Sequence, residues 1–223
     1  MPIRAVIFDV DGVLVDSEAS WFQAAVEFIR KLGQTWTEHD HHLCMGFAPV
    51  EWARYMRERF RLSLSPQVIQ AAVIDLMRKQ YEKNVPVLPG ALEAVHAAAG
   101  AYEVAVASGS PLELINHLAR LTGLETVFKA IVSGSDVGRG KPAPDIYLEA
   151  ARRLDVAPRE CVGIEDSANG ILSVKAAGMF SIAVPAPAYP LPEEVLRKAD
   201  RVLPSLEDFS VGLVQSLCPE RTA

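Results

Sequence analysis

The stretch VIFDVDGVLVDS, residues 6–17, decides how this chain folds. It continues an apolar, partly β-branched run that starts at Ile3, and Asp9 ends that run with a charge. A short apolar run with a polar stop is typical of a buried parallel strand. Asp9 and Asp11 are two residues apart, so along an extended chain both side chains point to the same side. Gly12 then lets the backbone turn away. Taken alone, the stretch fits either a site with two carboxylates or an ordinary Asp-Gly turn.

Five more apolar runs of the same kind follow, and helical patterns separate them. The runs occupy residues 102–107, 130–133, 161–164, 180–184 and 201–203. The helical patterns cover 91–99, 111–121, 142–154, 169–177 and a last segment from Ser205 to about Leu217. Strands that alternate with helices of this length indicate βαβ units and a parallel sheet covered on both faces. We therefore expect an α/β protein with a Rossmann-like parallel sheet core.

Residues 16–87 break this alternation. They contain no strand pattern and indicate four successive helices, at about 18–32, 37–44, 49–61 and 66–83. An all-helical block is thus inserted after the first strand. We expect a core made of residues 1–15 and 88–223, and a separate helical domain made of residues 16–87.

Composition excludes several classes of protein. The 223 residues are 50% hydrophobic and 22% charged, which is enough to bury a full core. No apolar run approaches the roughly 18 residues of a membrane helix, and the first residues do not resemble a signal peptide. The cysteines are far apart and odd in number, which argues against a disulfide framework. We expect a cytoplasmic protein, a monomer without a membrane partner.

The net charge of −6 argues against a broad nucleic-acid-binding surface, because such surfaces are basic. Residues 16–87 contain nine acidic and nine basic side chains, so the whole acidic excess lies outside them. We therefore asked whether some of the core carboxylates share a site.

Two more strand ends carry polar groups. Ser108, Gly109 and Ser110 follow the second apolar run, where a hydroxyl and free amides at a helix start suit an anion. Glu165 and Asp166 follow the fourth run, and carboxylates suit a hard cation such as Mg²⁺. Either group also fits a plain helix cap, so each signal alone is weak.

Lys141 lies between these motifs, in GRGKPAPDIY at residues 138–147. It precedes Pro142, which we expect at the first helical position. From there its ammonium can hold a phosphate and offset carboxylate charge, although most lysines are surface residues. Because parallel strands end on one edge of a sheet, the four motifs together predict carboxylates, a hydroxyl, amides and a lysine at one place.

These four motifs, in this order, resemble those of the haloacid-dehalogenase-like phosphohydrolase superfamily, in the branch with a helical cap between the first two motifs. The resemblance covers residues 1 to about 210. It is greatest to the β-phosphoglucomutase-like group, and within it to sugar-phosphate phosphatases such as 2-deoxyglucose-6-phosphate phosphatase. It implies a Mg²⁺-dependent phosphatase that acts on a small phosphate monoester, first of all a sugar phosphate, with residues 16–87 as a cap over the site.

The resemblance also implies a role for each motif residue. Asp9 would be the nucleophile that forms an aspartyl-phosphate, and Asp11 the general acid and base. Mg²⁺ would bind the Asp9 carboxylate, the Asp11 main-chain carbonyl and Asp166, with Glu165 at or beside the ion.

The remaining motif residues would hold the substrate. The phosphoryl oxygens would contact Ser108, the Gly109 amide and Lys141. Positions that would face the rest of the substrate are Asp16, Ser17, Ser110 and Gly46 in the loop of residues 45–47.

Other functions stay open. A phosphomutase of the β-phosphoglucomutase type would have a histidine ten residues after Asp11, where this chain has Trp21. It would also have an arginine after the cap-loop glycine, where this chain has Phe47, Ala48 and Pro49. Both departures favour hydrolysis. A dehalogenase has no proton-transfer task for Asp11, and the intact motif set argues against a binding scaffold without activity.

His39, His41 and His42, close to Cys44, also fit a second metal site. Neighbouring histidines on a polar helix are more often surface residues, and we expect no ion there.

Overall fold

A computed structural model describes residues 2–44, 49–186 and 190–218 of the chain. It divides the chain into two compact units. The first, which we name the sheet unit, comprises Met1–Asp16 and Val87–Ala223. The second, the helical unit, comprises Ser17–Pro86.

A six-stranded parallel sheet in the order β3-β2-β1-β4-β5-β6 forms the centre of the sheet unit. Its strands are β1 Ala5–Phe8, β2 Glu103–Ser108, β3 Ala130–Ser133, β4 Cys161–Glu165, β5 Phe180–Ala183 and β6 Arg201–Val202. The expected α/β, Rossmann-like sheet is therefore confirmed, with each strand within two residues of its expected range.

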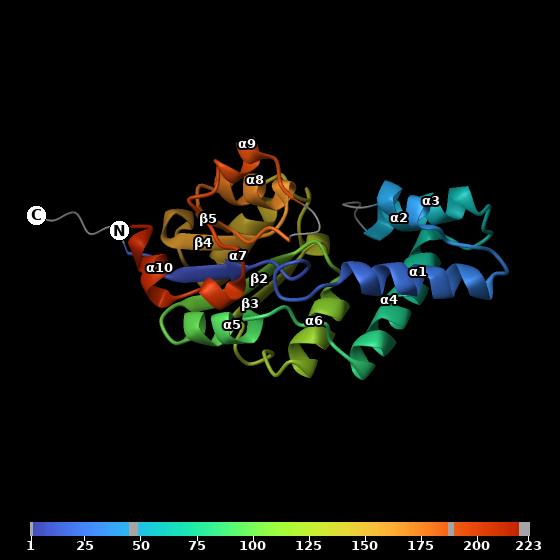
Figure 1. Cartoon of the computed structure of the whole chain (residues 1–223), viewed down its shortest axis with the longest axis horizontal. Helices are drawn as coiled ribbons and strands as arrows, with labels where there is room; N and C mark the ends of the chain where they lie inside the picture. The colour runs from blue at the N-terminus through green and yellow to red at the C-terminus, as the bar shows by residue number, and fades with distance from the viewer. Residues whose placement is uncertain (1, 45–48, 187–189, 219–223) are drawn as a thin grey trace, which may run out of the picture. The chain divides into compact units, whose positions relative to one another are not determined.

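Helices connect these strands. They are α5 Ala91–Ala99, α6 Leu112–Leu121, α7 Asp145–Leu154, α8 Ala168–Ala176, α9 Glu193–Leu196 and α10 Val211–Ser216. Short 3-10 turns lie at Gly134–Asp136, Pro158–Glu160 and Leu206–Asp208. Figure 1 shows α8 on one side of the sheet and α5 on the other.

The central strand β1 is buried along its whole length. Ala5 and Ile7 pack in one cluster with Tyr147 of α7 and Val174 of α8. The ring of Phe8 lies 6.2 Å from that of Phe209, between centroids. Successive strand residues point to opposite faces, so the continuous apolar run seen in the sequence reflects a strand covered on both sides.

The strand order fixes where a ligand can bind. From β1 the chain continues to β2 and β3 on one side, and then returns to β4 on the other side of β1. Ligands of open α/β sheets bind beyond the carboxyl ends of the strands at such a reversal. Here the reversal lies between β1 and β4, whose last paired residues are Phe8 and Ile164.

Two expected helices have different bounds. Pro142 is not the first helical residue: residues 141–144 form a turn, and α7 begins at Asp145. The segment from Ser205 to Leu217 is not one helix, because a second serine starts a new one. Ser205 accepts a hydrogen bond from the Glu207 amide at 3.1 Å, and Ser210 accepts one from the Leu213 amide at 3.1 Å. Competing serine caps of this kind divide a helix.

The helical unit contains α1 Glu18–Lys31, α2 Glu38–Cys44, α3 Pro49–Arg59 and α4 Pro66–Lys83. Aromatic side chains fill part of its core. The ring of Trp36, 3% exposed, lies 5.8 to 6.0 Å between centroids from Trp52, Tyr55 and Phe60. Aromatic pairs at this spacing add to the free energy of burial.

Asp40 is the buried carboxylate of this unit, with 1% of its surface exposed. Oδ2 accepts from the amide and the hydroxyl of Thr37 at 3.1 and 2.7 Å. Oδ1 accepts from the Tyr55 hydroxyl and from Nε of Arg59, both at 2.9 Å. Burial raises the pKa of Asp40, but these hydrogen bonds outweigh it and hold the pKa at about 2.

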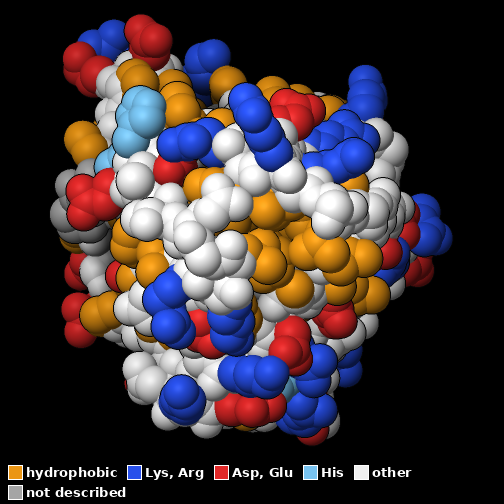
Figure 2. Space-filling model, turned by 90° about the vertical axis from the view of Figure 1, so that its right-hand side faces the viewer, with side chains coloured by type: hydrophobic (Ala, Val, Ile, Leu, Met, Phe, Trp, Pro, Cys, Tyr) orange, Lys and Arg blue, Asp and Glu red, His pale blue; other side chains and the backbone are white. Residues whose placement is uncertain are grey.

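No helix in the described part of the chain is long and apolar enough to span a membrane. Figure 2 shows Lys and Arg side chains mixed with Asp and Glu side chains over the face that it presents, with hydrophobic side chains between them. Neither sign of charge forms a continuous surface on that face.

Candidate active site

Asp9 is the first residue after β1 and lies at the reversal of strand order. Its amide donates to the carbonyl of Ile164 in β4 at 3.0 Å, which ties it to both central strands. The residue is 7% exposed. Oδ1 lies 3.0 Å from the ammonium nitrogen of Lys141, and no other described group donates a hydrogen bond to this atom. A buried carboxylate oxygen that has one charged neighbour, itself shared with another carboxylate, is only partly compensated.

Glu165 ends β4 and is fully buried. Oε1 lies 2.5 Å from Nζ of Lys141 and accepts from the Tyr147 hydroxyl at 2.7 Å. Oε2 accepts from the Ser167 hydroxyl at 3.2 Å. A Cβ on Gly170 would lie 1.9 Å from the carboxyl carbon of Glu165, so only glycine at the start of α8 leaves room for this carboxylate.

Asp166 completes a group of three carboxylates. One oxygen each of Asp9, Glu165 and Asp166 lies within 4.8 Å of the other two. Gly12 has a φ of +76°, and a Cβ there would lie 2.0 Å from Oδ2 of Asp166. Glycine is therefore needed at residue 12 both for the turn and for the approach of Asp166.

The negative charges of these carboxylates exceed the one positive charge of Lys141 beside them. Burial, together with the charges of Glu165, Asp11 and Asp166, raises the pKa of Asp9 well above its usual value, and Lys141 opposes this only in part. Burial and then Glu165 raise the pKa of Asp166 to about 7. Burial lowers the pKa of Lys141, but Asp9 and Glu165 outweigh it and keep the ammonium charged.

The residues present fit a hard divalent cation. Mg²⁺ binds through one or two carboxylates and keeps several waters. Asp9, Glu165 and Asp166 offer three clustered oxygens, and the single ammonium of Lys141 pairs with Asp9 and Glu165. Among the residues that the structure describes, no other group of three His, Cys, Asp or Glu side chains is close enough to hold an ion.

Asp11 turns towards the end of β2. Its Oδ2 accepts from the hydroxyl of Ser108 at 3.1 Å and from that of Ser110 at 2.6 Å. Ser108 is fully buried and Ser110 is 6% exposed, so both donors are held by the core. Two hydrogen bonds to one oxygen fix the direction of the carboxylate.

The loop after β2 precedes α6. The amide of Ser110 donates to the hydroxyl of Ser108 at 3.1 Å. A Cβ on Gly109 would meet open space, so the side of this residue on which a side chain would stand is uncrowded. An uncrowded backbone in front of a helix N-terminus is a suitable place for an anion.

The structure thus brings together most of the residues expected from the sequence, in two neighbouring groups. One contains Asp9, Lys141, Glu165 and Asp166, and the other Asp11, Ser108 and Ser110. Of the expected substrate-facing positions in and beside the helical block, Asp16 is exposed and Ser17 is 2% exposed. Gly46 lies outside the described residues, and these positions stay predictions.

Three contacts of the site were not expected from the sequence. They are the Tyr147 hydroxyl on Glu165, the Ser167 hydroxyl on Glu165 and the space at Gly170. Tyr147 is six residues after Lys141, but no spacing rule indicates which face of α7 meets β4.

Two of the three histidines that would also fit a second metal site contact other groups. Nε2 of His41 lies 3.1 Å from Oε2 of Glu18, and Nδ1 of His42 lies 2.7 Å from the carbonyl oxygen of Glu38. Both contacts are within the helical unit.

Known proteins are similar to this chain in sequence and in fold. A family model described as haloacid dehalogenase-like hydrolase matches residues 3–178. Hexitol phosphatase B of Escherichia coli K12 is 34% identical over 189 residues, which are 83% of this chain and 85% of the relative. The bifunctional riboflavin kinase/FMN phosphatase of Arabidopsis thaliana is 33% identical over 206 residues. That match covers 92% of this chain and 54% of the relative, so the chain spans about half of the relative's length.

A solved structure agrees with the fold. The crystal structure of CbbY from Rhodobacter sphaeroides in complex with phosphate superposes with a TM-score of 0.85 and 27% identity, covering 96% of this chain and 99% of the other. The family model extends over more than half of the sequence and includes Asp9, Ser108, Lys141 and Asp166. The chain belongs to the haloacid dehalogenase-like hydrolase family.

Proposed function

We propose that this protein is a Mg²⁺-dependent phosphatase that hydrolyses a small phosphate monoester through an aspartyl-phosphate on Asp9. The observation that carries the proposal is the buried group of three carboxylates at the ends of β1 and β4, with Lys141 beside Asp9 and Glu165. Membership of a hydrolase family supports the reaction class, and two relatives are phosphatases by name.

In the first step, an oxygen of Asp9 attacks the phosphorus and the bond to the ester oxygen breaks. The leaving alkoxide takes a proton from Asp11. The hydrogen bonds from Ser108 and Ser110 direct the Asp11 carboxyl group before this transfer. Such prior positioning lowers the barrier because little reorganisation is left to the reaction.

In the second step, water attacks the phosphorus of the aspartyl-phosphate. Asp11 takes the proton of the water, the bond to Asp9 breaks, and inorganic phosphate leaves. Asp9 and Asp11 return to their starting states, so one water is consumed for each ester.

The remaining groups of the site offset the negative charge of the carboxylates and of the phosphoryl group. Asp9, Asp11, Glu165 and Asp166 with Lys141 carry a formal −3 when ionised. When bound by Asp9, Asp166, the Asp11 carbonyl and Glu165 nearby, Mg²⁺ would supply two positive charges for the phosphoryl oxygens. Lys141 and the Gly109 amide would hold those oxygens in line with Asp9, and Ser108 would join them by turning its one hydroxyl proton from Asp11 to the phosphate.

The substrate class in this proposal is a phosphorylated sugar or sugar alcohol. The name of hexitol phosphatase B supports this choice. In the same proposal the helical unit selects the leaving group, and Asp16, Ser17, Ser110 and Gly46 contribute to that selection.

A panel of hexose, hexitol, glycolate and nucleotide monophosphates, assayed with Mg²⁺ and with EDTA, tests the proposal. We expect phosphate release from at least one sugar phosphate in Mg²⁺ only. Release at the same rate in EDTA would contradict the metal role. A hexose bisphosphate belongs in the panel, since isomerisation without phosphate release would identify a phosphomutase instead.

A further inference from the structure

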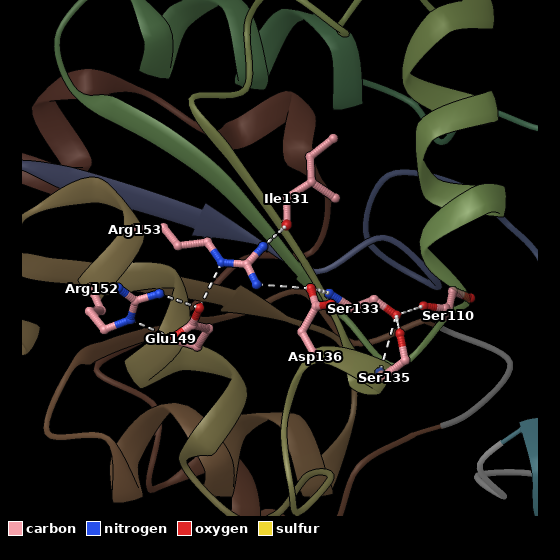
Figure 3. A network of polar contacts seen from close by, with 8 residues as sticks. All are labelled: Ser110, Ile131, Ser133, Ser135, Asp136, Glu149, Arg152 and Arg153. Carbon is pink, nitrogen blue, oxygen red and sulfur yellow. Dashed lines mark hydrogen bonds and ion pairs between the residues drawn. The ribbon is translucent and has the colours of Figure 1, made fainter.

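A buried serine on β3 supports the loop that carries Ser110. Ser133 is the last residue of β3 and is fully buried. Its hydroxyl donates to the main-chain carbonyl of Ser110 at 2.7 Å (Figure 3). Ser110 in turn donates its own hydroxyl to Asp11 at 2.6 Å. One serine therefore separates Ser133 from the carboxyl group that transfers the proton in the proposed reaction.

The direction of this contact is fixed by Ser135. The amide and the hydroxyl of Ser135 both donate to the hydroxyl oxygen of Ser133, at 3.3 and 3.1 Å. A serine hydroxyl has one proton and two lone pairs. With both lone pairs occupied, the proton of Ser133 is directed to the carbonyl of Ser110.

The turn after β3 is itself anchored. The amide of Ser133 donates to Oδ2 of Asp136 at 3.1 Å, which completes a capping box on the short turn Gly134–Asp136. Nη2 of Arg153 lies 3.1 Å from the same oxygen, and Nη1 donates to the carbonyl of Ile131 at 2.7 Å. Figure 3 shows Arg153 reaching from α7 to both groups.

The backbones of the two loops also approach each other closely at Gly134 and Gly109. A Cβ on Gly134 would lie 3.3 Å from the carbonyl oxygen of Gly109 and 3.4 Å from its Cα. A side chain at residue 134 would press on Gly109, which belongs to the phosphate-binding loop of the proposed mechanism. Among the described residues, only the hydrogen bond from Ser133 joins this support directly to the loop of residues 109 and 110, so a displacement of Ser133 would be transmitted to Ser110.

We propose that Ser133 is a positioning residue for the reaction, and that it acts through Ser110 on Asp11. The inference rests on the proposed function. Asp136 and Arg153 are the outer part of the same support, because they hold Ser133 and the end of β3. The hydroxyl of Ser133 touches no reacting atom, so its contribution is geometric: it fixes the carbonyl of Ser110 and thereby the hydrogen bond from Ser110 to Asp11.

The test compares Ser133→Ala, Ser133→Thr and Ser181→Ala in Mg²⁺ with the best sugar phosphate of the panel. Ser181→Ala is the matched control, because Ser181 is a fully buried strand serine whose hydroxyl has no hydrogen-bond partner. We expect kcat to fall about tenfold in Ser133→Ala, with KM within about twofold of the wild-type value. Ser133→Thr, which keeps the hydroxyl, should recover most of kcat, and Ser181→Ala should match the wild type.

A double variant separates positioning from a structural role. If Ser133 acts through Ser110, then Ser133→Ala should reduce kcat by less than about twofold in a Ser110→Ala background. Asp136→Ala, at a partly exposed position, is the second single variant and should lower kcat about threefold without a comparable change in KM.

The outcomes are distinct. A wild-type protein that hydrolyses no phosphate ester overturns the proposed function, and this inference with it. An active wild type with equal kcat in Ser133→Ala and Ser181→Ala overturns the inference alone. The same holds if Ser133→Ala and Ser110→Ala reduce kcat by independent factors that multiply, since Ser133 would then not act through Ser110.

Discussion

The two units contain buried carboxylates with opposite surroundings. In the helical unit, Asp40 accepts four hydrogen bonds and has its pKa lowered to about 2. In the sheet unit, Oδ1 of Asp9 has the Lys141 ammonium as its one neighbouring donor among the described residues, the pKa of Asp9 is raised, and the pKa of Asp166 is raised to about 7. Burial acts in the same direction on all three, so the difference comes from the donors and charges around them.

In our proposal this difference separates a carboxylate that stabilises the fold from carboxylates that take part in the reaction. The donors of Asp40 come from its own helix start and from α3, and they stabilise the fold of that unit. The carboxylates of the sheet unit share one lysine, which leaves them short of positive charge. In our account a bound cation supplies the missing positive charge, both for these carboxylates and for the phosphoryl oxygens of the substrate. The predictions below compare the carboxylates of the two units.

The largest effect is expected for Asp9→Asn. Loss of the nucleophile should lower phosphate release by at least about a thousandfold. The same change removes a buried charge that is poorly compensated, so the metal-free protein at pH 8 should gain about 1 kcal/mol in free energy of unfolding. Urea unfolding in EDTA, alongside the activity assay, measures both. Reduced activity together with reduced stability would mean that Asp9 has a structural role like that of Asp40.

Asp40→Asn should instead lower stability and leave magnesium binding unchanged. The amide nitrogen of the asparagine cannot accept a hydrogen bond, and it would face one of the two pairs of donors that now contact Asp40. The helical unit should therefore lose about 2 kcal/mol in free energy of unfolding. All three tryptophans lie within Ser17–Pro86, so their fluorescence during urea unfolding reports on this unit. Magnesium affinity should stay within about twofold of the wild-type value, because Asp40 is not part of the carboxylate group. An unchanged midpoint would show that the hydrogen bonds of Asp40 contribute little.

The raised pKa of Asp166 predicts a pH dependence of metal binding. Below pH 7 its carboxyl group carries a proton that a cation must displace, and above pH 7 it is ionised. Magnesium affinity should therefore rise by about tenfold between pH 6 and pH 8, since a pKa near 7 changes the ionised fraction by that factor. Isothermal titration at the two pH values measures it. Asp166→Asn is the control, and equal wild-type affinities would contradict the prediction.

The smallest effect is expected for Tyr147→Phe. The ring that lies 5.4 Å from Nζ of Lys141 stays, and only the hydroxyl that donates to Glu165 is lost. Magnesium affinity should fall by about threefold, since a single hydrogen bond to a carboxylate is removed. Tyr102→Phe is the matched control: its hydroxyl donates to the carbonyl of Val211 at 3.4 Å, away from the carboxylates. An equal affinity in both variants would show that Glu165 needs no donor from α7.

Much of this site follows from the sequence because it is built at strand ends. Asp9, Ser108 and Glu165 each close an apolar run, and the carboxyl ends of parallel strands share one edge. The supporting contacts could not be predicted, since they depend on helix rotation and on close packing. Tyr147 reaches Glu165 only in the observed orientation of α7, and the donors of Asp40 come partly from residues fifteen and nineteen positions later.

One experiment tests the central claim most directly: phosphate release by the wild type and by Asp9→Asn, each in Mg²⁺ and in EDTA, with the best ester of the panel. Our account predicts release only by the wild type in Mg²⁺. Release that persists in EDTA, or in Asp9→Asn with Mg²⁺, would show that the carboxylate group at the ends of β1 and β4 is not the catalytic centre.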